Sequence, residues 1–222
     1  MKFIDRRTAG QALTRKLRGK ISNKTVVVAL PRGGVVLGFE MAKSLDAPLG
    51  IILVRKIGHP AFSEYAIAAL AEGEKLVYSE TDLMPVDELW LASAEKNTRG
   101  QIAQLRSLYF TQHYSQPEIA GNTAIIVDDG MATGLTMQAA VRAVRHMNPA
   151  KIVVAVPVAS GESVELVEPI VDDFVVLDKP KNFLGVVGAH YLHFPQIKDM
   201  TVRQLLERSK IYGLRHTATL NS

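Results

Sequence analysis

One stretch, residues 123–137, constrains the fold of this chain more than any other. It begins with a β-branched run over residues 123–127, which predicts a buried strand. Two adjacent carboxylates follow, Asp128 and Asp129, and then a turn of small residues. Beyond the turn, apolar residues recur at helical spacing: Met137, Ala140, Val141, Val144 and Met147. The stretch therefore predicts a strand that passes through a short turn into an amphipathic helix.

The turn between the acids and the helix has the composition of an anion-binding loop. The first backbone N–H groups of a helix have no internal partners and point outward, so they can donate to a phosphate. Glycines let the backbone approach the anion closely, and the hydroxyls of Thr133 and Thr136 add donors. A carboxylate at the tip of the preceding strand is well placed to accept hydrogen bonds from vicinal ribose hydroxyls. Phosphate on the turn and ribose on the acids together describe a 5-phosphoribosyl group.

Residues 125–137 resemble the phosphoribosyl diphosphate (PRPP) binding motif of the type I phosphoribosyltransferases, which has an apolar strand, two acids and a Gly/Ala/Thr phosphate loop. The resemblance implies that Asp128 and Asp129 are the catalytic residues and hold the ribose. It extends the ribose and 5-phosphate site to Gly130, Met131, Ala132, Thr133, Gly134, Leu135 and Thr136. The alternative is a strand-to-helix turn with solvated acids. Rival phosphate motifs, the P-loop and G-x-G-x-x-G after a strand, do not fit.

A second strand–loop–helix unit precedes this one. Residues 25–30 form a continuous apolar run, which predicts a strand buried on both faces of a parallel sheet. A glycine-rich loop follows, and then apolar residues at helical spacing. In the family that the later motif resembles, this loop holds the diphosphate, which implies Arg32, Gly33 and Gly34 as its contacts. The alternative is a tight turn that needs two glycines, with Arg32 merely exposed.

The next predicted strand, residues 49–54, is followed by a basic pair that includes Lys56. Ligands bind beyond the carboxyl ends of the strands in open α/β sheets, so Lys56 is a further candidate for diphosphate binding. The alternative is a surface lysine. His59 lies in the same loop beside Pro60 and is not placed among the catalytic residues.

The alternation of strands and helices predicts an α/β fold, with one doubly wound, mostly parallel sheet of the Rossmann-like type I phosphoribosyltransferase kind and a small hood or lid. Residues 1–222 are expected to form this single domain, with residues 57–115 as a loop and helix insertion. The insertion contains a predicted hairpin near residues 66–78, where the family carries a mobile loop, and a long helix over residues 85–109 that Gly100 divides. Further helices are expected over residues 3–17 and 164–170, strands over 151–158 and 174–177, and a last helix begun by a capping box of Thr201 and Gln204.

Residues 180–200 are expected to form the hood. Within them, residues 183–199 resemble the segment after the last strand in uncharacterised stand-alone predicted phosphoribosyltransferases. The matching positions are Phe183, Gly188, Tyr191, Phe194 and Asp199. Pro195 departs from the family pattern, which has a polar residue there. The aromatic residues, with His190 and His193, either cover an acceptor base or form the core of a small subdomain; the two histidines lack a nearby third ligand for a metal.

Composition favours a small anionic substrate. The net charge is +4, but lysine and arginine are scattered, whereas nucleic-acid binding usually shows a denser patch. The basic residues of the first helix are predicted to form a solvated face: Arg6, Arg7, Arg15, Lys16 and Arg18. The absence of cysteine excludes thiolate catalysis and disulfides. No apolar run approaches a membrane span and the N-terminus does not resemble a secretory signal, so a cytoplasmic location is expected.

The resemblance implies transfer of a 5-phosphoribosyl group from PRPP to an unidentified acceptor, a nitrogenous base in most relatives, with release of diphosphate. It also implies a homodimer and Mg²⁺ as cofactor, held mainly through PRPP oxygens rather than by protein ligands. The alternative is a non-catalytic regulatory protein of the same fold that senses PRPP or nucleotides. A weaker third possibility is an interaction protein that has kept the fold without the ligand, against which the intact acid pair and phosphate loop argue.

Overall fold

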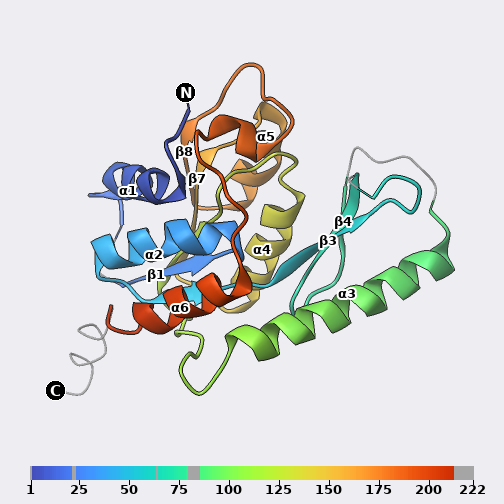
Figure 1. The fold of residues 1–222 in the computed structure, drawn as a ribbon, viewed down its shortest axis with the longest axis horizontal. Helices are drawn as coiled ribbons and strands as arrows, with labels where there is room; N and C mark the ends of the chain where they lie inside the picture. The colour runs from blue at the N-terminus through green and yellow to red at the C-terminus, as the bar shows by residue number, and fades with distance from the viewer. Residues whose placement is uncertain (1, 22–23, 64, 80–85, 213–222) are drawn as a thin grey trace.

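The centre of the molecule is a five-stranded sheet with the order β2-β1-β6-β7-β8 (Figure 1). The structure, a computed structural model, describes residues 2–21, 24–63, 65–79 and 86–212. All neighbouring strands of this sheet are parallel. The strands are β1 (Thr25–Ala29), β2 (Leu49–Ile51), β6 (Thr123–Val127), β7 (Lys151–Val158) and β8 (Asp173–Asp178). The predicted parallel α/β sheet is confirmed.

Helices cover both faces of this sheet because its strands are apolar on both sides. Alternate residues of β1 point to opposite layers, so that Val27 packs in one core cluster and Val26 in the other. The first cluster includes apolar residues of α1 (Arg6–Leu17), α2 (Gly33–Leu45) and α6 (Asp199–Ser209). The second includes those of α4 (Leu135–His146) and α5 (Gly161–Val167). Two short 3₁₀ helices, η1 (Glu168–Ile170) and η2 (Val187–His190), complete this part.

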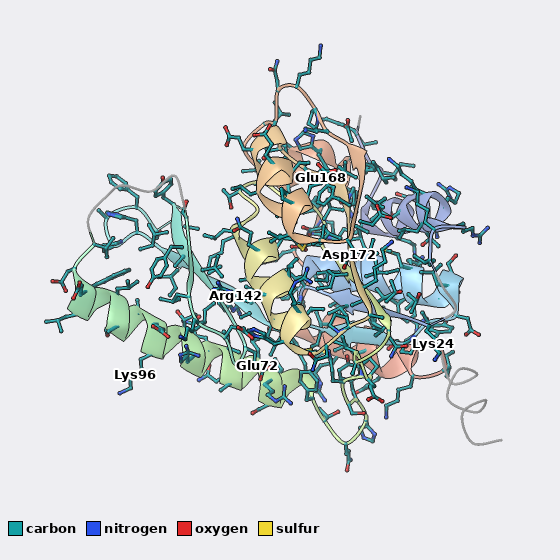
Figure 2. All side chains as sticks on the ribbon, turned by 180° about the vertical axis from the view of Figure 1, so that it is seen from behind. Lys24, Glu72, Lys96, Arg142, Glu168 and Asp172 are labelled. Atoms are coloured by element: carbon teal, nitrogen blue, oxygen red, sulfur yellow. The ribbon has the colours of Figure 1, made fainter. Side chains whose placement is uncertain are left out.

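A second, antiparallel sheet with the order β3-β4-β5 stands to one side of the parallel sheet (Figure 1). It consists of β3 (Val54–Gly58), β4 (Ala66–Ala71) and β5 (Val77–Tyr78), and it contains the predicted hairpin. The long helix α3 (Glu88–Tyr109) runs beneath it, and Arg106 Nη1 lies 2.9 Å from Glu72 Oε2 of the turn after β4. Lys96 extends from α3 away from the rest of the molecule (Figure 2).

Several details of the predicted elements are wrong, among them the start of the first helix, which is Arg6 rather than residue 3. The run at residues 49–54 is not one strand, because β2 ends at Ile51 and Val54 begins β3 of the other sheet. Gly100 does not divide α3, since a single glycine costs only about 1 kcal/mol of helix propensity, too little to break a helix of this length. The last helix begins at Asp199 rather than at a Thr201 capping box, and its N-cap residue Lys198 makes no side-chain capping bond.

Residues 216–222, whose terminal position predicts a frayed tail, lie outside the described residues, as does Pro85, the predicted start of the long helix. Within the described ranges, every helix is too short or too polar to cross a membrane.

Candidate functional site

The site lies beyond the carboxyl ends of β1 and β6, two neighbouring strands of the parallel sheet. The helices that follow these strands, α2 and α4, pack on opposite faces of the sheet. From β1 the chain passes through α2 to β2, and from β6 it passes through α4 to β7, on the other side of the sheet. The carboxyl ends of β1 and β6 are in register, with Ala29 beside Val127, and the N–H of Leu30 donates to the carbonyl of Val127 at 3.0 Å. Ligands of open α/β sheets bind at such a switch point, beyond the carboxyl ends of the strands.

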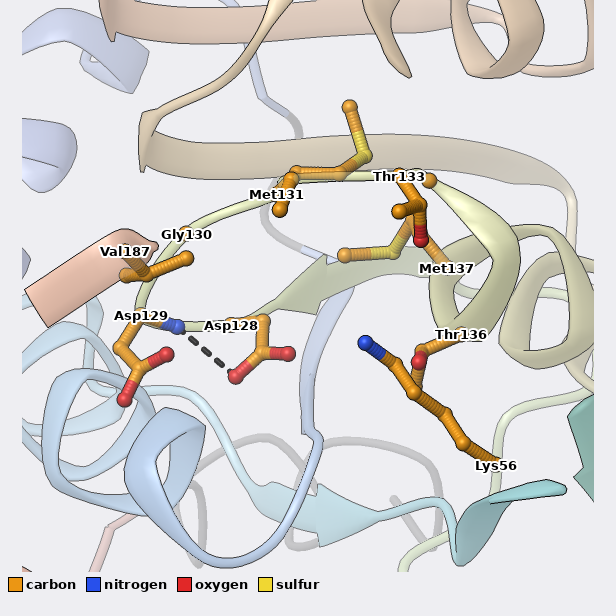
Figure 3. Close-up of a pocket in the computed structure, with 11 residues that line it drawn as sticks. Lys56, Asp128, Asp129, Gly130, Met131, Thr133, Thr136, Met137 and Val187 are labelled. Atoms are coloured by element: carbon orange, nitrogen blue, oxygen red, sulfur yellow. Dashed lines mark hydrogen bonds between the residues drawn. The ribbon is translucent and has the colours of Figure 1, made fainter. Parts of the chain in front are cut away.

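A cavity of ≈ 180 Å³ opens beside this switch point (Figure 3). It is lined by Lys56, Asp128, Asp129, Gly130, Met131, Ala132, Thr133, Gly134, Thr136, Met137 and Val187. Leu135 does not line it, because its side chain is buried in the core with α4. Among the predicted diphosphate contacts, Lys56 lines this cavity, whereas Arg32, Gly33 and Gly34 do not. The structure therefore places Lys56 with the predicted 5-phosphate loop.

Two serines at the start of α5 bind the carbonyl groups of the predicted phosphate loop. The hydroxyl of Ser160 donates to the carbonyl of Ala132 at 2.6 Å, and the hydroxyl of Ser163 donates to the carbonyl of Met131 at 3.1 Å. Both carbonyls are thereby held on the side of the loop next to α5. Sequence reasoning missed these serines, because only the folded chain brings α5 beside the loop.

The loop donors, by contrast, are unused. In the part of the chain that the structure describes, no hydrogen bond occupies the backbone N–H groups of residues 132–136. Thr136 Oγ1 is buried and also has no hydrogen-bond partner there. Gly134 lies immediately before α4 with φ +76°, a backbone conformation that residues other than glycine rarely adopt. Unpaired donors at the N-terminus of a helix suit an anion such as phosphate.

Asp128 and Asp129 stand together at the tip of β6 but have different partners. The backbone N–H of Asp129 donates to Asp128 Oδ1 at 2.8 Å, and the Asp128 carboxylate shares the cavity with the ammonium group of Lys56 (Figure 3). Burial raises the pKa of Asp128 well above its usual value of 3.8, and the neighbouring Asp129 charge raises it further. Burial also raises the pKa of Asp129, opposed by the guanidinium of Arg6. Donors from a ligand would stabilise the charged form of these acids.

The prediction that Arg6 lies on a solvated face of the first helix is wrong. It is 7% exposed rather than solvated, and its Nε donates to Asp129 Oδ2 at 2.8 Å. Arg7, Arg15, Lys16 and Arg18 are exposed as predicted. The sequence did contain a signal, because Arg6 precedes Ala9, Leu13 and Leu17 at the spacing of their apolar stripe and so faces the core with them.

The loop after β1 packs directly against the acids. A Cβ at Gly33 would lie 1.9 Å from Asp129 Oδ2, and one at Gly34 would lie 2.7 Å from the carbonyl oxygen of Val127. The two glycines are thus required by close approach to the tip of β6. The Pro31–Arg32 peptide bond is cis. Arg32 turns toward a separate cavity of ≈ 40 Å³ near α3, and its Nη1 lies 3.8 Å from Asp199 Oδ2.

The predicted hood segment contributes contacts to the acid pair. The hydroxyl of Tyr191 donates to the backbone carbonyl of Asp129 at 2.6 Å. Tyr191 and His190 are buried, whereas His193 is exposed. His190 stacks on Phe183 with ring centroids 4.8 Å apart. For Tyr191 and His190, packing in the core is therefore the observed role.

His59, in the loop after β3, is also buried, and its Nδ1 accepts from the N–H of Ala61 at 3.1 Å.

Comparisons with known proteins support an assignment for the region that contains this site. The family model described as "Phosphoribosyl transferase domain" matches residues 5–192. A Mycobacterium tuberculosis protein that carries the provisional name phosphoribosyl transferase, found in two strains, is 36% identical over 209 residues, which cover 93% of this chain and 47% of the relative. The chain thus spans about half the length of these curated relatives. Protein TT1426 from Thermus thermophilus has a similar crystal structure, with a TM-score of 0.78, 37% identity, and coverage of 94% of this chain and 99% of that one.

Proposed function

We propose, from the premise that the chain belongs to the phosphoribosyl transferase domain family, that its cavity binds PRPP and that it transfers the 5-phosphoribosyl group to an acceptor with release of diphosphate. One observation carries the proposal. A loop with unused N–H groups and two carboxylates at the tip of a parallel strand line the same cavity. The first is suited to a phosphate and the second to vicinal hydroxyls, so the cavity is suited to a ribose 5-phosphate unit.

Different residues of the cavity would bind the 5-phosphate and the ribose of PRPP. The N–H groups of residues 132–136 and the hydroxyl of Thr136 would donate to the 5-phosphate, with the ammonium of Lys56 opposite them. Asp128 and Asp129 would accept hydrogen bonds from the ribose hydroxyls. Transfer breaks the bond between ribose C1 and a diphosphate oxygen, and positive charge grows on the ring as the bond breaks. Fixed carboxylates beside the ring would stabilise that charge, so catalysis depends mainly on positioning and electrostatics.

The diphosphate would lie over the loop after β1. The N–H groups of Gly33 and Gly34 begin α2 beside the acid pair, and a helix N-terminus favours an anion. Arg32 would supply a cation by leaving its long contact with Asp199. The described residues contain no cluster of three metal-ligating side chains, so Mg²⁺ would be held through the oxygens of PRPP. Bound there, the ion would neutralise the departing diphosphate.

Lys56→Ala and Arg32→Ala are expected to have different effects. Because Lys56 lines the phosphate cavity, its loss should weaken both PRPP and ribose 5-phosphate by about tenfold, the value of one charge-assisted hydrogen bond. Arg32→Ala should weaken PRPP alone, since ribose 5-phosphate has no diphosphate. Calorimetric titration with the two ligands measures this, with the outward-pointing Lys96→Ala as control. If Lys56→Ala weakened PRPP but left ribose 5-phosphate unchanged, Lys56 would belong to the diphosphate as first predicted.

Diphosphate release distinguishes a transferase from a PRPP sensor. The protein is mixed with PRPP, Mg²⁺ and a panel of purine and pyrimidine bases, and released diphosphate is measured against a mixture without base. A transferase releases diphosphate only with a suitable base. A protein that binds PRPP but releases diphosphate with no member of the panel would favour the non-catalytic sensor.

The proposal includes a homodimer. Large apolar side chains are exposed on the loop between β3 and β4, on β5 and on α3, where a second copy would cover them: Phe62, Tyr65, Tyr78 and Leu89. Sedimentation at several concentrations measures the mass in solution, and a monomer throughout would contradict this part of the proposal.

A further inference from the structure

A buried arginine from the first helix reaches one acid of the site. Arg6 and Asp129 are 123 positions apart in the sequence, and the side chains are 8% and 17% exposed. Besides its 2.8 Å bond to Asp129 Oδ2, Arg6 donates from Nη1 to the carbonyl of Pro195 at 2.8 Å. Its guanidinium carbon lies 3.5 Å from the centroid of the Phe194 ring. One side chain thus joins α1, the tip of β6 and the segment after η2.

Asp129 is held at its backbone as well as at its carboxylate. The Tyr191 hydroxyl bonds to its carbonyl oxygen at 2.6 Å, and the Tyr191 ring packs against Phe194 with centroids 4.7 Å apart. The absence of a side chain at Gly33 leaves room for Asp129 Oδ2 and for Arg6 Nε, which lies 3.0 Å from the position of a Cβ there. The carboxylate therefore has little freedom to rotate. Arg6 is bonded to Oδ2, and among the described residues no other side chain is hydrogen-bonded to the second oxygen of this carboxylate.

Attachment of α1 to the core does not require this arginine. Ala9, Leu13 and Leu17 are fully buried on the same stripe, and they already fix the helix against the sheet. An apolar residue at position 6 would serve packing without the cost of burying a charge. Arg7 shows the ordinary arrangement, because it pairs with Glu40 at 2.7 Å while its side chain remains 64% exposed.

We infer that Arg6 is a positioning residue of the PRPP site, which fixes the direction and the negative charge of the Asp129 carboxylate so that its other oxygen can accept from the ribose. The inference rests on the proposed function. Arg6 does not touch the ligand in this role; it acts through Asp129. The N-terminal helix and the segment 187–195 are then parts of the ribose site.

The charged and titratable groups around Asp129 determine how PRPP binding should depend on pH if Arg6 has this positioning role. They are Arg6 from α1, Asp128 from the same loop, Lys56 from β3 and Tyr191 from the segment after η2. Arg6 opposes the effect of burial, which raises the pKa of Asp129. Without Arg6, Asp129 should be ionised only at higher pH, so PRPP binding should depend more strongly on pH than in the wild type, which loss of a packing role of Arg6 would not produce.

The test is PRPP titration with Mg²⁺ at a lower and a higher pH, about 6 and about 9, with every variant compared with the wild type at the same pH. Arg6→Gln should weaken binding at the lower pH by at least about tenfold, as loss of an orienting partner does for metal ligands, and part of this loss should disappear at the higher pH. Arg6→Lys keeps the charge but not the planar fork, so it should bind less tightly than the wild type with a similar pH dependence. Arg7→Gln is the matched control on the same helix and should bind like the wild type.

Thermal melts show whether each variant folds. If Arg6→Gln fails to melt cooperatively, Arg6→Lys decides: weakened PRPP binding by a folded Arg6→Lys protein supports the inference, and wild-type affinity overturns it. Wild-type affinity of folded Arg6→Gln at both pH values, or equal weakening by Arg7→Gln, would also overturn it. Failure of the wild-type protein itself to bind PRPP would instead contradict the proposed function, and the positioning role would fall with it.

Discussion

Replacement of Asp128 and Asp129 by asparagine is expected to abolish PRPP binding while the protein still unfolds cooperatively. The ribose hydroxyls would lose two charged acceptors, each worth roughly 1.5–3 kcal/mol, so affinity should fall by at least about 100-fold. Asparagine has nearly the same shape, and Asn at position 128 can still accept the 2.8 Å bond from the N–H of residue 129. Calorimetric titration of the double variant measures the loss, with Asp173→Asn, a carboxylate at the start of β8, as control. Unchanged PRPP binding by the double variant would refute the roles assigned to the acids.

The Asp128→Asn single variant should also be more stable than the wild type at neutral pH when no ligand is present. Burial raises the pKa of Asp128 in the folded state above its unfolded value of 3.8. An acid of this kind contributes stability below its unfolded pKa, and this contribution is lost as pH rises through the folded pKa. Asparagine does not ionise, so the variant avoids the loss and its Tm should be higher at neutral pH than that of the wild type. A lower Tm of the Asp128→Asn variant than of the wild type at neutral pH would show that burial of the Asp128 carboxylate does not destabilise the fold.

Gly33→Ala is the second change with a large expected effect. The added Cβ would stand 1.9 Å from Asp129 Oδ2, so the carboxylate must move away from both Gly33 and Arg6. Overpacking of this kind costs roughly 1–3 kcal/mol of stability. Displacement of Asp129 should in addition weaken PRPP binding by about 100-fold, because a misplaced acceptor loses its charge-assisted bond and leaves its ligand donor unpaired. Denaturant unfolding and PRPP titration measure the two effects.

Gly100→Ala is the matched control for this substitution. Gly100 lies within α3, and a Cβ there would have nothing within 4 Å. The change should raise the free energy of unfolding by roughly 0.5–1 kcal/mol, because alanine favours a helix over glycine, and PRPP binding should not change. Wild-type stability and wild-type binding in Gly33→Ala would contradict the close packing of the β1 loop on the acids.

The parts of the fold that could be predicted are those encoded by local sequence. β1, β6 and β7 are continuous apolar runs, so their burial in a parallel sheet follows from composition alone. The loop after β6 could also be predicted, because acids, glycines and threonines stand between a strand and a helix. By contrast, periodicity does not show which sheet a strand joins. The run at residues 49–54 was therefore taken as one strand, although β2 ends at Ile51 and Val54 begins β3 of the other sheet.

The contacts that hold the site in place could not be predicted, since they connect distant segments. Ser160 and Ser163 reach the loop only because β7 pairs with β6, and Arg6 reaches Asp129 only because α1 packs on the same face as α2. Charge alone suggested that Arg6 is solvated. Its place on the apolar stripe of α1 was the better guide, because a charged residue that faces the core requires a buried partner.

Calorimetric titration of the wild-type protein with PRPP, with and without Mg²⁺, and with ribose 5-phosphate for comparison, measures directly whether the cavity binds PRPP. The cavity predicts that both ligands bind, because both carry the 5-phosphate and the ribose hydroxyls. It also predicts tighter, Mg²⁺-dependent binding of PRPP, since only PRPP has a diphosphate for the β1 loop and the metal. No heat and no thermal stabilisation with either ligand would contradict PRPP binding by this cavity.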